Sequence, residues 1–378
     1  MAETPGRLIA LRLEGEPLAE AIAEAWGGGD AVLPLPPALP EETLRPLLAE
    51  MRPADLVSAE GRLTLPDPEP VDPGVAAVML TSGSTGAPKG VELTHAALRE
   101  SAEMVSARLG AGPGDRWLLC VPLHHIAGLS ILVRSALIGG GPVIHPRFGV
   151  AGVAGERGAN LVSLVPTMLA RLLDAGVDLS RWRRVLVGGG ALRPDLLERA
   201  RAAGAPVVTT YGMTETCGGC VLDGRPLERV ELALGQGGVI AIGGPMLMEG
   251  YRARPELTAS TLRDGRLQTA DVGRWAADGR LEVLGRVDDV IVTGGEKVWP
   301  VAVAARLSEH PLVADAAVMG EPDPEWGQRV VALVVPTDPG APPSSGELRA
   351  WVAARLESHN APRAVVILPH LPGPASGG

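Results

Sequence analysis

Aromatic residues and cysteines are scarce in this sequence of 378 residues. Aromatic residues make up 3% of the chain, with one Phe and two Tyr, so the core has to be built mainly from Leu, Val and Ala. Three cysteines are too few for a disulfide framework in a chain of this length. Positive charge is also in deficit, with 34 Lys and Arg against 44 Asp and Glu. The net charge of -10 argues against a nucleic-acid partner.

Long apolar runs are missing as well. The longest candidate, residues 128–144, is interrupted by Arg134 and by glycines, and it is shorter than the about 20 apolar residues that span a bilayer. The first fifteen residues include acidic side chains and no uninterrupted apolar segment, which argues against a signal peptide. We therefore expect a cytoplasmic protein without membrane insertion, and whether it forms a homo-oligomer is left open.

Glycine is abundant, and one glycine-rich stretch, LTSGSTGAPKG at residues 80–90, has the composition of a phosphate-binding loop. The P-loop pattern G-x-x-x-x-G-K-[ST] does not fit, because Pro88 precedes Lys89 and Gly90 follows it. The continuous apolar run at 75–80 predicts a buried strand that leads into this loop. Thr94 is a suitable N-cap for a helix that ends at Gly110.

Apolar strands alternate with segments of helical spacing along the first two thirds of the chain, which predicts an α/β fold with a largely parallel sheet. From about residue 238 short alternating segments predict hairpins, one of them turning at Asp278-Gly279. The last 90 or so residues have the pattern of a small α+β unit. We predict an N-terminal domain at 1–286 and a C-terminal domain at 287–378.

Four stretches together resemble the adenylate-forming superfamily of acyl-CoA ligases, in the order that this family has. They are TSGSTGAPKG (81–90), YGMTE (211–215), TADVGRW (269–275) and GRVDDVIVTGGEKVWP (285–300). The resemblance implies that residues 1–286 form a large α/β domain with mostly parallel sheets, which binds ATP and the acyl substrate. It implies that residues 287–378 form a small, mobile α+β domain that rotates. It implies ATP and CoA as co-substrates and Mg²⁺ as the metal ion.

The first two motifs are those that the resemblance assigns to the nucleotide and its metal. Glycines allow backbone N–H groups to approach phosphate, hydroxyl groups add donors, and Lys89 adds positive charge. Glu215 is expected to bind Mg²⁺, which prefers oxygen ligands. Thr214 is expected at the AMP phosphate and Tyr211 on the adenine. The other nucleotide-binding residues implied here are Thr81, Ser82, Gly83, Ser84, Thr85, Gly86, Gly188, Gly189, Gly190, Gly212 and Met213.

The third and fourth motifs supply the residues expected at the ribose and at the domain junction. Asp271 stands where family members hold the ribose hydroxyls, and Arg286 is expected to assist it. Asp288 matches the hinge about which the small domain turns between adenylation and thioester formation. Residues 292–297 resemble the segment that lines the CoA tunnel.

Residues 121–140, VPLHHIAGLSILVRSALIGG, carry information about the acyl substrate. By resemblance His125 borders the acyl site. The residues expected to be catalytic are Lys89, Thr85, Thr214, Glu215 and His125. The extended stretch is similar to that of o-succinylbenzoate–CoA ligases of menaquinone synthesis. Because this substrate is a dicarboxylate, Ser130 and Arg134 are candidate partners for its second carboxylate.

Three alternatives remain open at this stage. The enzyme could activate another aryl or alkyl acid, or transfer it to a carrier-protein thiol. A protein that only binds nucleotide or acyl-adenylate is the alternative from another class.

Cys217 and Cys220 form a C-x-x-C pair, but Cys120 is the one other cysteine, so a four-thiolate metal site cannot form.

The C-terminal stretch LPGPASGG (371–378) departs from the family pattern, in which a lysine contacts the carboxylate and phosphate during adenylation. Gly378 occupies the place of that lysine. Either the sequence is truncated or altered there, or the lysine lies just beyond it, or the protein lacks it. Without such a contact we expect adenylation to be slower by on the order of 10²–10³. A normal rate of pyrophosphate exchange by this chain would contradict that expectation.

Overall fold

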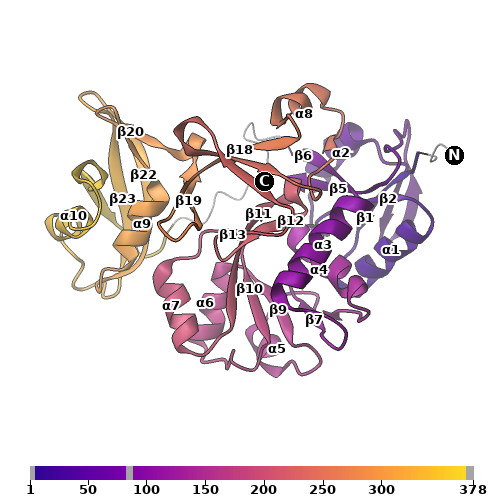
Figure 1. The fold of residues 1–378 in the computed structure, drawn as a ribbon, viewed down its shortest axis with the longest axis horizontal. Helices are drawn as coiled ribbons and strands as arrows, with labels where there is room; N and C mark the ends of the chain where they lie inside the picture. The colour runs from indigo at the N-terminus through magenta and orange to yellow at the C-terminus, as the bar shows by residue number, and fades with distance from the viewer. Residues whose placement is uncertain (1–4, 82–87, 372–378) are drawn as a thin grey trace.

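The computed structural model describes residues 5–81 and 88–371. In these residues the strands form four sheets, and helices pack against the sheets (Figure 1). Among the described residues no helix is both long enough and apolar enough to cross a bilayer. The large domain contains three of the sheets and the small domain contains the fourth. This division agrees with the expected α/β class.

The first sheet carries the strands on both sides of the glycine-rich loop. It has seven strands in the order β16-β6-β5-β2-β1-β3-β4. Its strands are β1 (Leu8–Arg12), β2 (Ala31–Pro34), β3 (Asp55–Ser58), β4 (Gly61–Thr64), β5 (Val75–Thr81), β6 (Lys89–Thr94) and β16 (Gly250–Tyr251). The strands β3, β1, β2 and β5 run parallel. Because the chain reverses after β5, β6 is antiparallel to both of its neighbours, β5 and β16, and β4 is antiparallel to β3.

The second sheet also has seven strands, in the order β13-β12-β11-β10-β9-β7-β8. They are β7 (Trp117–Leu119), β8 (Val143–Ile144), β9 (Leu161–Leu164), β10 (Arg184–Val187), β11 (Val207–Met213), β12 (Gly218–Leu222) and β13 (Arg225–Pro226). Five of these strands, β8, β7, β9, β10 and β11, are parallel, as the strand–helix alternation predicts. The edge strands β12 and β13 are antiparallel additions.

Helices fill the space between these sheets and cover their outer faces. The first six are α1 (Gly15–Gly27), α2 (Glu41–Met51), α3 (His95–Leu109), α4 (Ile126–Leu137), α5 (Val150–Gly155) and α6 (Pro166–Asp174). The helix α7 (Pro194–Ala202) packs beside α6, and α3 packs beside α4. Since α3 contacts both β6 and β12, it lies between the two sheets (Figure 1). The predicted cap is confirmed, because the Thr94 hydroxyl accepts from the Ala97 amide at 3.0 Å.

The third sheet is antiparallel throughout and consists of the hairpins expected from residue 238 onward. Its strands are β14 (Glu231–Leu234), β15 (Val239–Gly243), β17 (Leu262–Arg263), β18 (Arg266–Trp275) and β19 (Leu281–Arg286), and α8 (Pro255–Thr261) precedes β17. The turn between β18 and β19 contains Gly279 at a φ of 77°, as the Asp278-Gly279 pair predicts. Antiparallel strands therefore make up a larger share of the large domain than the alternation alone suggested.

The small domain has its own sheet and its own core. Its strands are β20 (Ile291–Thr293), β21 (Glu296–Val298), β22 (Val313–Asp323), β23 (Gly327–Pro336) and β24 (Ala364–Ile367). Two helices, α9 (Pro300–Ser308) and α10 (Ser345–Ala353), pack on it. An ion pair of 3.2 Å between Arg193 and Asp315 joins the small domain to the large one.

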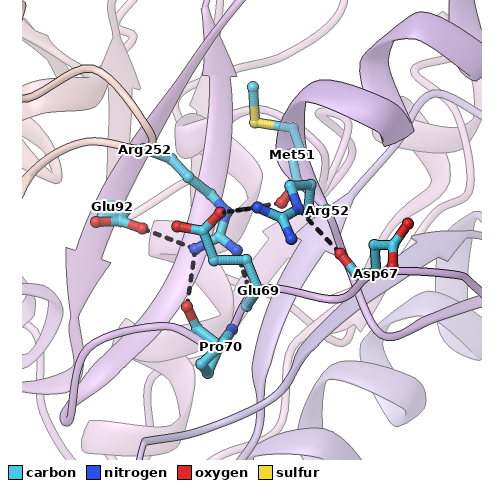
Figure 2. Close-up of polar contacts among 7 residues, drawn as sticks. All are labelled: Met51, Arg52, Asp67, Glu69, Pro70, Glu92 and Arg252. Carbon is cyan, nitrogen blue, oxygen red and sulfur yellow. Dashed lines mark hydrogen bonds and ion pairs between the residues drawn. The ribbon is translucent and has the colours of Figure 1, made fainter.

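A buried arginine directly after β16, Arg252, holds the first sheet together at the loop (Figure 2). The Arg252 side chain is 4% exposed, and its guanidinium donates to the carbonyl oxygens of Met51, Glu69 and Pro70. It also pairs with the Glu92 carboxylate at 3.1 Å. These partners lie at the end of α2, in the segment before β5 and on β6. The Arg252 side chain therefore joins its own segment to three other stretches of chain around the loop.

Replacing Arg252 with methionine is expected to lower the free energy of unfolding by about 3–5 kcal/mol, because the Glu92 carboxylate, which is 13% exposed, loses its partner. The control is Arg52→Met, whose neighbouring ion pair with Glu69 is about half exposed (Figure 2). An exposed pair contributes at most about 1 kcal/mol. Urea denaturation followed by circular dichroism measures both variants, and equal losses would contradict the role assigned to Arg252.

Candidate active site

The glycine-rich loop is carried between two strands whose ends are well fixed. Thr81 at the end of β5 pairs with Lys89 at the start of β6. A Cβ atom at Gly90 would lie 2.7 Å from both the Met51 sulfur and a Val78 methyl carbon, so a larger residue there would force these side chains to move. The five loop residues predicted to bind phosphate lie outside the described residues, and their roles stay predictions: Ser82, Gly83, Ser84, Thr85 and Gly86.

Lys89 and Glu215, predicted on separate motifs, meet at opposite parts of one tyrosine. The Tyr251 hydroxyl donates to Glu215 Oε1 at 2.9 Å. The Lys89 Nζ lies 5.2 Å from the centroid of the Tyr251 ring, within the range of a cation–π contact. Burial and the nearby Glu215 carboxylate raise the pKa of Tyr251, so its phenol remains protonated and acts as a donor. The sequence analysis did not single out Tyr251.

Glu215 lies in a tight turn between β11 and β12, in the 3-10 helix Thr214–Thr216. The Thr216 hydroxyl closes this turn, because it accepts from the Met213 amide at 2.9 Å and lies 2.6 Å from the Gly218 carbonyl oxygen. A Cβ atom at Gly212 would lie 2.0 Å from that same oxygen, which explains the glycine. Thr214 and Met213 therefore sit on a turn of fixed shape. The sequence analysis missed Thr216, although it directly follows Glu215.

Tyr211, Asp271 and Arg286 come together from three strands. The Tyr211 hydroxyl donates to Asp271 Oδ2 at 2.8 Å, and Arg286 Nη1 donates to Asp271 Oδ1 at 3.3 Å. Asp271 and Arg286 are also direct partners in the pairing of β18 with β19. Burial and the Asp271 carboxylate raise the pKa of Tyr211. Three residues predicted for the nucleotide thus form one hydrogen-bonded group.

The glycines 188–190 follow the carboxyl end of β10. At the same end of the sheet, the neighbouring strand β11 continues to Tyr211. A Cβ atom at Gly188 would lie 2.4 Å from the Thr210 methyl group, so the two strands approach closely there. Gly189 has a φ of 74°, which favours glycine. Ligands of open α/β sheets bind at the carboxyl ends of the strands, and both segments lie at such ends.

The predicted acyl residues lie on and before α4. His125 precedes the first residue of α4, and its ring lies 4.5 Å from that of His124. Burial, with His125 as a second cause, lowers the pKa of His124 to about 4. The Ser130 hydroxyl donates to the Ala127 carbonyl oxygen at 3.0 Å. Since that bond lies within α4, it leaves the acceptor side of the hydroxyl available.

Arg134 is buried, with 3% exposure, and its guanidinium carbon lies 4.5 Å from the Trp117 ring centroid. Burial lowers its pKa to about 9. Among the described residues no carboxylate forms an ion pair with it, and its Nε has no hydrogen-bond partner there. A buried charge without a counter-charge is costly, so this arginine needs an explanation.

A cavity of about 190 Å³ lies beside the segment that contains the two histidines. Its walls are largely apolar and include Leu123, His124, Phe148 and Met168. Met168 lies in the first turn of α6, which begins at Pro166. The Pro166 ring lies 3.8 Å from where a Cβ atom of Gly190 would be, so this helix begins beside the glycines 188–190. Ser130 and Arg134 do not line this cavity. The structure therefore keeps the two candidate carboxylate partners apart from it.

The remaining predicted residues are distributed as follows. Asp288 lies in a 3-10 helix between β19 and β20, with its carboxylate 3.9 Å from Arg286. The Lys297 ammonium of β21 lies 3.9 Å from the position that a Cβ of Gly237 would take, so this part of the small domain faces the large one. Cys217 and Cys220 are fully buried in the hydrophobic core, where burial raises their thiol pKa.

Comparison with known proteins gives a family for this arrangement. The chain matches AMP-binding enzymes over residues 30–252 and the C-terminal domain of AMP-binding enzymes over residues 302–377. It is 45% identical over 317 residues to a probable 2-succinylbenzoate–CoA ligase of Mycobacterium tuberculosis, covering 80% of this chain and 82% of the relative. It is 36% identical over 352 residues to a feruloyl-CoA synthase of Amycolatopsis, covering 84% and 72%.

Solved structures agree with these matches. The o-succinylbenzoate CoA synthetase of Bacillus subtilis, in complex with its acyl-adenylate intermediate, superposes with a TM-score of 0.85 at 30% identity, covering 97% of this chain and 86% of the other. The same enzyme with ATP and magnesium gives a TM-score of 0.83 at 30% identity, covering 98% and 87%. The four motifs, the two-domain fold and these matches agree, and the chain belongs to the family of AMP-binding enzymes.

Proposed function

We propose that this protein is an acid–thiol ligase that joins o-succinylbenzoate to CoA at the expense of ATP, as in menaquinone biosynthesis. The names of its relatives support this assignment, because ligases for this acid are found both among the similar sequences and among the similar structures. The observation that carries the proposal is that residues from three sheets come together: Tyr251 contacts both Glu215 and Lys89, and Tyr211, four residues before Glu215, donates to Asp271. Phosphate, metal and ribose groups can be held there at once.

The reaction consists of two displacements. A carboxylate oxygen of the acid attacks the α-phosphorus of ATP, the bond to the bridging oxygen breaks, and pyrophosphate leaves. The CoA thiol, as it loses its proton, attacks the carbonyl carbon of the acyl-adenylate, and AMP leaves. Lys89 and the loop residues offset the charge that develops on the phosphates. Thr214 is proposed to contact the AMP phosphate, with Tyr211 beside the adenine and His125 beside the acyl group.

Glu215 fits the metal that this reaction uses. No cluster of three or more His, Cys, Asp or Glu exists among the described residues, so the protein alone supplies no complete cage. Mg²⁺ usually takes one or two carboxylates and completes its shell with water and substrate phosphates, so a single carboxylate suits it. When bound there, the ion would supply positive charge that offsets the negative charge of the ATP phosphates. The tight turn fixes the backbone of Glu215 for this role.

The domain boundary, hinge and cellular setting are part of the same proposal. The third sheet ends at Arg286 and the fourth begins at Ile291, which supports domains at 1–286 and 287–378 with Asp288 as the hinge. Rotation there would bring residues 292–297 to the CoA thiol. We place the enzyme in the cytoplasm, where ATP and CoA are available, and keep a homo-oligomer as a prediction.

Arg134 supports a dicarboxylate rather than a simple aryl acid. Its buried guanidinium forms no ion pair among the described residues. An anionic group on a ligand would compensate it, and because Arg134 does not line the cavity beside His124, that group would have to reach it beyond the cavity wall. The second carboxylate of o-succinylbenzoate is such a group. The similarity to a feruloyl-CoA synthase keeps a mono-acid as the alternative substrate, and it would leave Arg134 without a counter-charge.

The activity is tested by incubating the protein with ATP, Mg²⁺, CoA and each of a panel of acids, with product detection by mass spectrometry. We expect a CoA thioester and AMP with o-succinylbenzoate and much less with ferulate. A Glu215→Gln variant is the control, because it keeps the shape of the side chain and removes its charge. A protein that uses ferulate better than o-succinylbenzoate would contradict the proposed substrate, and one that forms no thioester would contradict the reaction.

Replacing Asp271 with asparagine is expected to raise the KM for ATP roughly 10- to 100-fold, the size of a lost hydrogen bond to a charged group. The KM for the acid should change little, because the residue is proposed to hold the ribose. The matched control is Asp278→Asn, in the exposed turn of the same hairpin. Steady-state kinetics with each substrate varied in turn provide the measurement. An unchanged KM for ATP would contradict the ribose role.

Replacing Arg134 with methionine is expected to raise the KM for o-succinylbenzoate roughly 10- to 100-fold, because a charge-assisted contact is lost. The KM of a matched keto acid without the ring carboxylate should not change. The melting temperature of the ligand-free variant should not fall, since an uncompensated buried charge is removed. An unchanged KM for o-succinylbenzoate would remove Arg134 from the substrate site.

A further inference from the structure

We propose that Tyr251 is a positioning residue that holds Glu215 and Lys89 apart and oriented for Mg·ATP. The inference rests on the proposed function, because it takes these two residues as the metal and phosphate contacts. Tyr251 is 6% exposed and lies on β16, the edge strand that pairs with β6. It is thus built into the sheet that carries Lys89, while its hydroxyl reaches the turn that carries Glu215.

The two contacts use different parts of the side chain. The hydroxyl donates to Glu215 Oε1 at 2.9 Å, and the ring face receives the Lys89 ammonium at 5.2 Å from its centroid. Two opposite charges this near to one side chain would otherwise attract each other and form an ion pair. In this structure, where both residues are described, they form none with each other. A neutral phenol between them leaves the cation for phosphate and the anion for metal.

Glu215 is held by the same segment through its backbone. The Met248 amide donates to the Glu215 carbonyl oxygen at 2.9 Å, three residues before Tyr251. Main chain and carboxylate of Glu215 are therefore both fixed by residues 248–251. A carboxylate with one oxygen oriented by a donor loses rotational freedom before the metal arrives, which favours binding.

Tyr251 is itself rigidly anchored. Its amide donates to the Thr258 hydroxyl at 2.8 Å, and the Arg252 amide donates to the Gly90 carbonyl oxygen at 2.8 Å. The next residue in the sequence is Arg252, whose buried guanidinium donates to the Met51 carbonyl oxygen (Figure 2). Beside it, Arg254 pairs with Glu50 and donates to the Pro88 carbonyl oxygen at 3.3 Å, at the exit of the loop. These bonds tie the position of the phenol to the sheet on which the phosphate loop stands.

The test is the Mg²⁺ dependence of ATP binding, measured by calorimetry on the full chain without acid or CoA. Tyr251→Phe keeps the ring and removes the hydroxyl. It should raise the Mg²⁺ concentration needed for half-maximal enhancement of ATP binding by roughly tenfold. ATP affinity without Mg²⁺ should stay the same. Tyr251→Leu removes both contacts, so it should also weaken ATP binding without Mg²⁺.

The other tyrosine of the chain supplies a matched control. Tyr211→Phe breaks a phenol–carboxylate bond of 2.8 Å, but its carboxylate is that of Asp271. It should weaken ATP binding equally with and without Mg²⁺. Combining Tyr251→Phe with Glu215→Gln should produce no further shift, because the hydroxyl acts through that carboxylate.

Three results would overturn the inference. They are an unchanged or lower Mg²⁺ requirement in Tyr251→Phe, the same Mg²⁺-specific shift in Tyr211→Phe, and a wild-type chain that binds ATP no better with Mg²⁺ than without it. Melting curves of each variant establish that it is folded. Because binding is measured without acid and CoA, a failure to form thioester would count against the proposed function and leave this measurement valid.

Discussion

The buried guanidinium of Arg252 is the contact on which the geometry around the phosphate loop depends. Burying a charged group to 4% exposure costs free energy unless its donors are used, and here three carbonyl oxygens and the Glu92 carboxylate accept them (Figure 2). The partners come from positions up to about 200 residues away in the sequence. This bonding attaches a strand of two residues, β16, to the edge of the first sheet. Together with the bonds of the Tyr251 and Arg252 amides, it holds Tyr251 beside Lys89 and Glu215.

The strands and turns that the sequence predicts well are those whose cause is local. The buried strand at 75–80, the Thr94 cap and the turn at Asp278-Gly279 each follow from residue types within a few positions, and the structure has all three. Edge strands such as β13, β16 and β17 have two residues each, and so short a segment has no periodicity to detect. Their pairing is decided by contacts distant in sequence, which a single sequence does not display.

The site residues follow the same division. The motifs marked Tyr211, Asp271 and Arg286 as members of one function, yet gave no indication that the tyrosine would donate to the aspartate. That bond joins residues 60 positions apart. Tyr251 was missed because the residues around it carry no chemical pattern of their own. Its significance arises from the distance to Glu215 and Lys89, and both distances exist only once the sheets are packed.

Aromatic residues are scarce in this chain, and its two tyrosines have the same kind of contact. Each places a phenol against a carboxylate of the site, Tyr211 against Asp271 and Tyr251 against Glu215. Burial is the main cause of the raised pKa of both phenols, so both stay donors. A neutral donor orients a carboxylate without cancelling its charge, whereas a lysine or arginine in the same place would compete with the ligand. Arg286 also reaches Asp271, but it is half exposed and screened by water, so the phenol is the stronger constraint. In the proposed roles Glu215 receives a cation and Asp271 receives ribose hydroxyls, and neutral phenol donors leave the charge of both carboxylates available for this, whereas ion pairs would not.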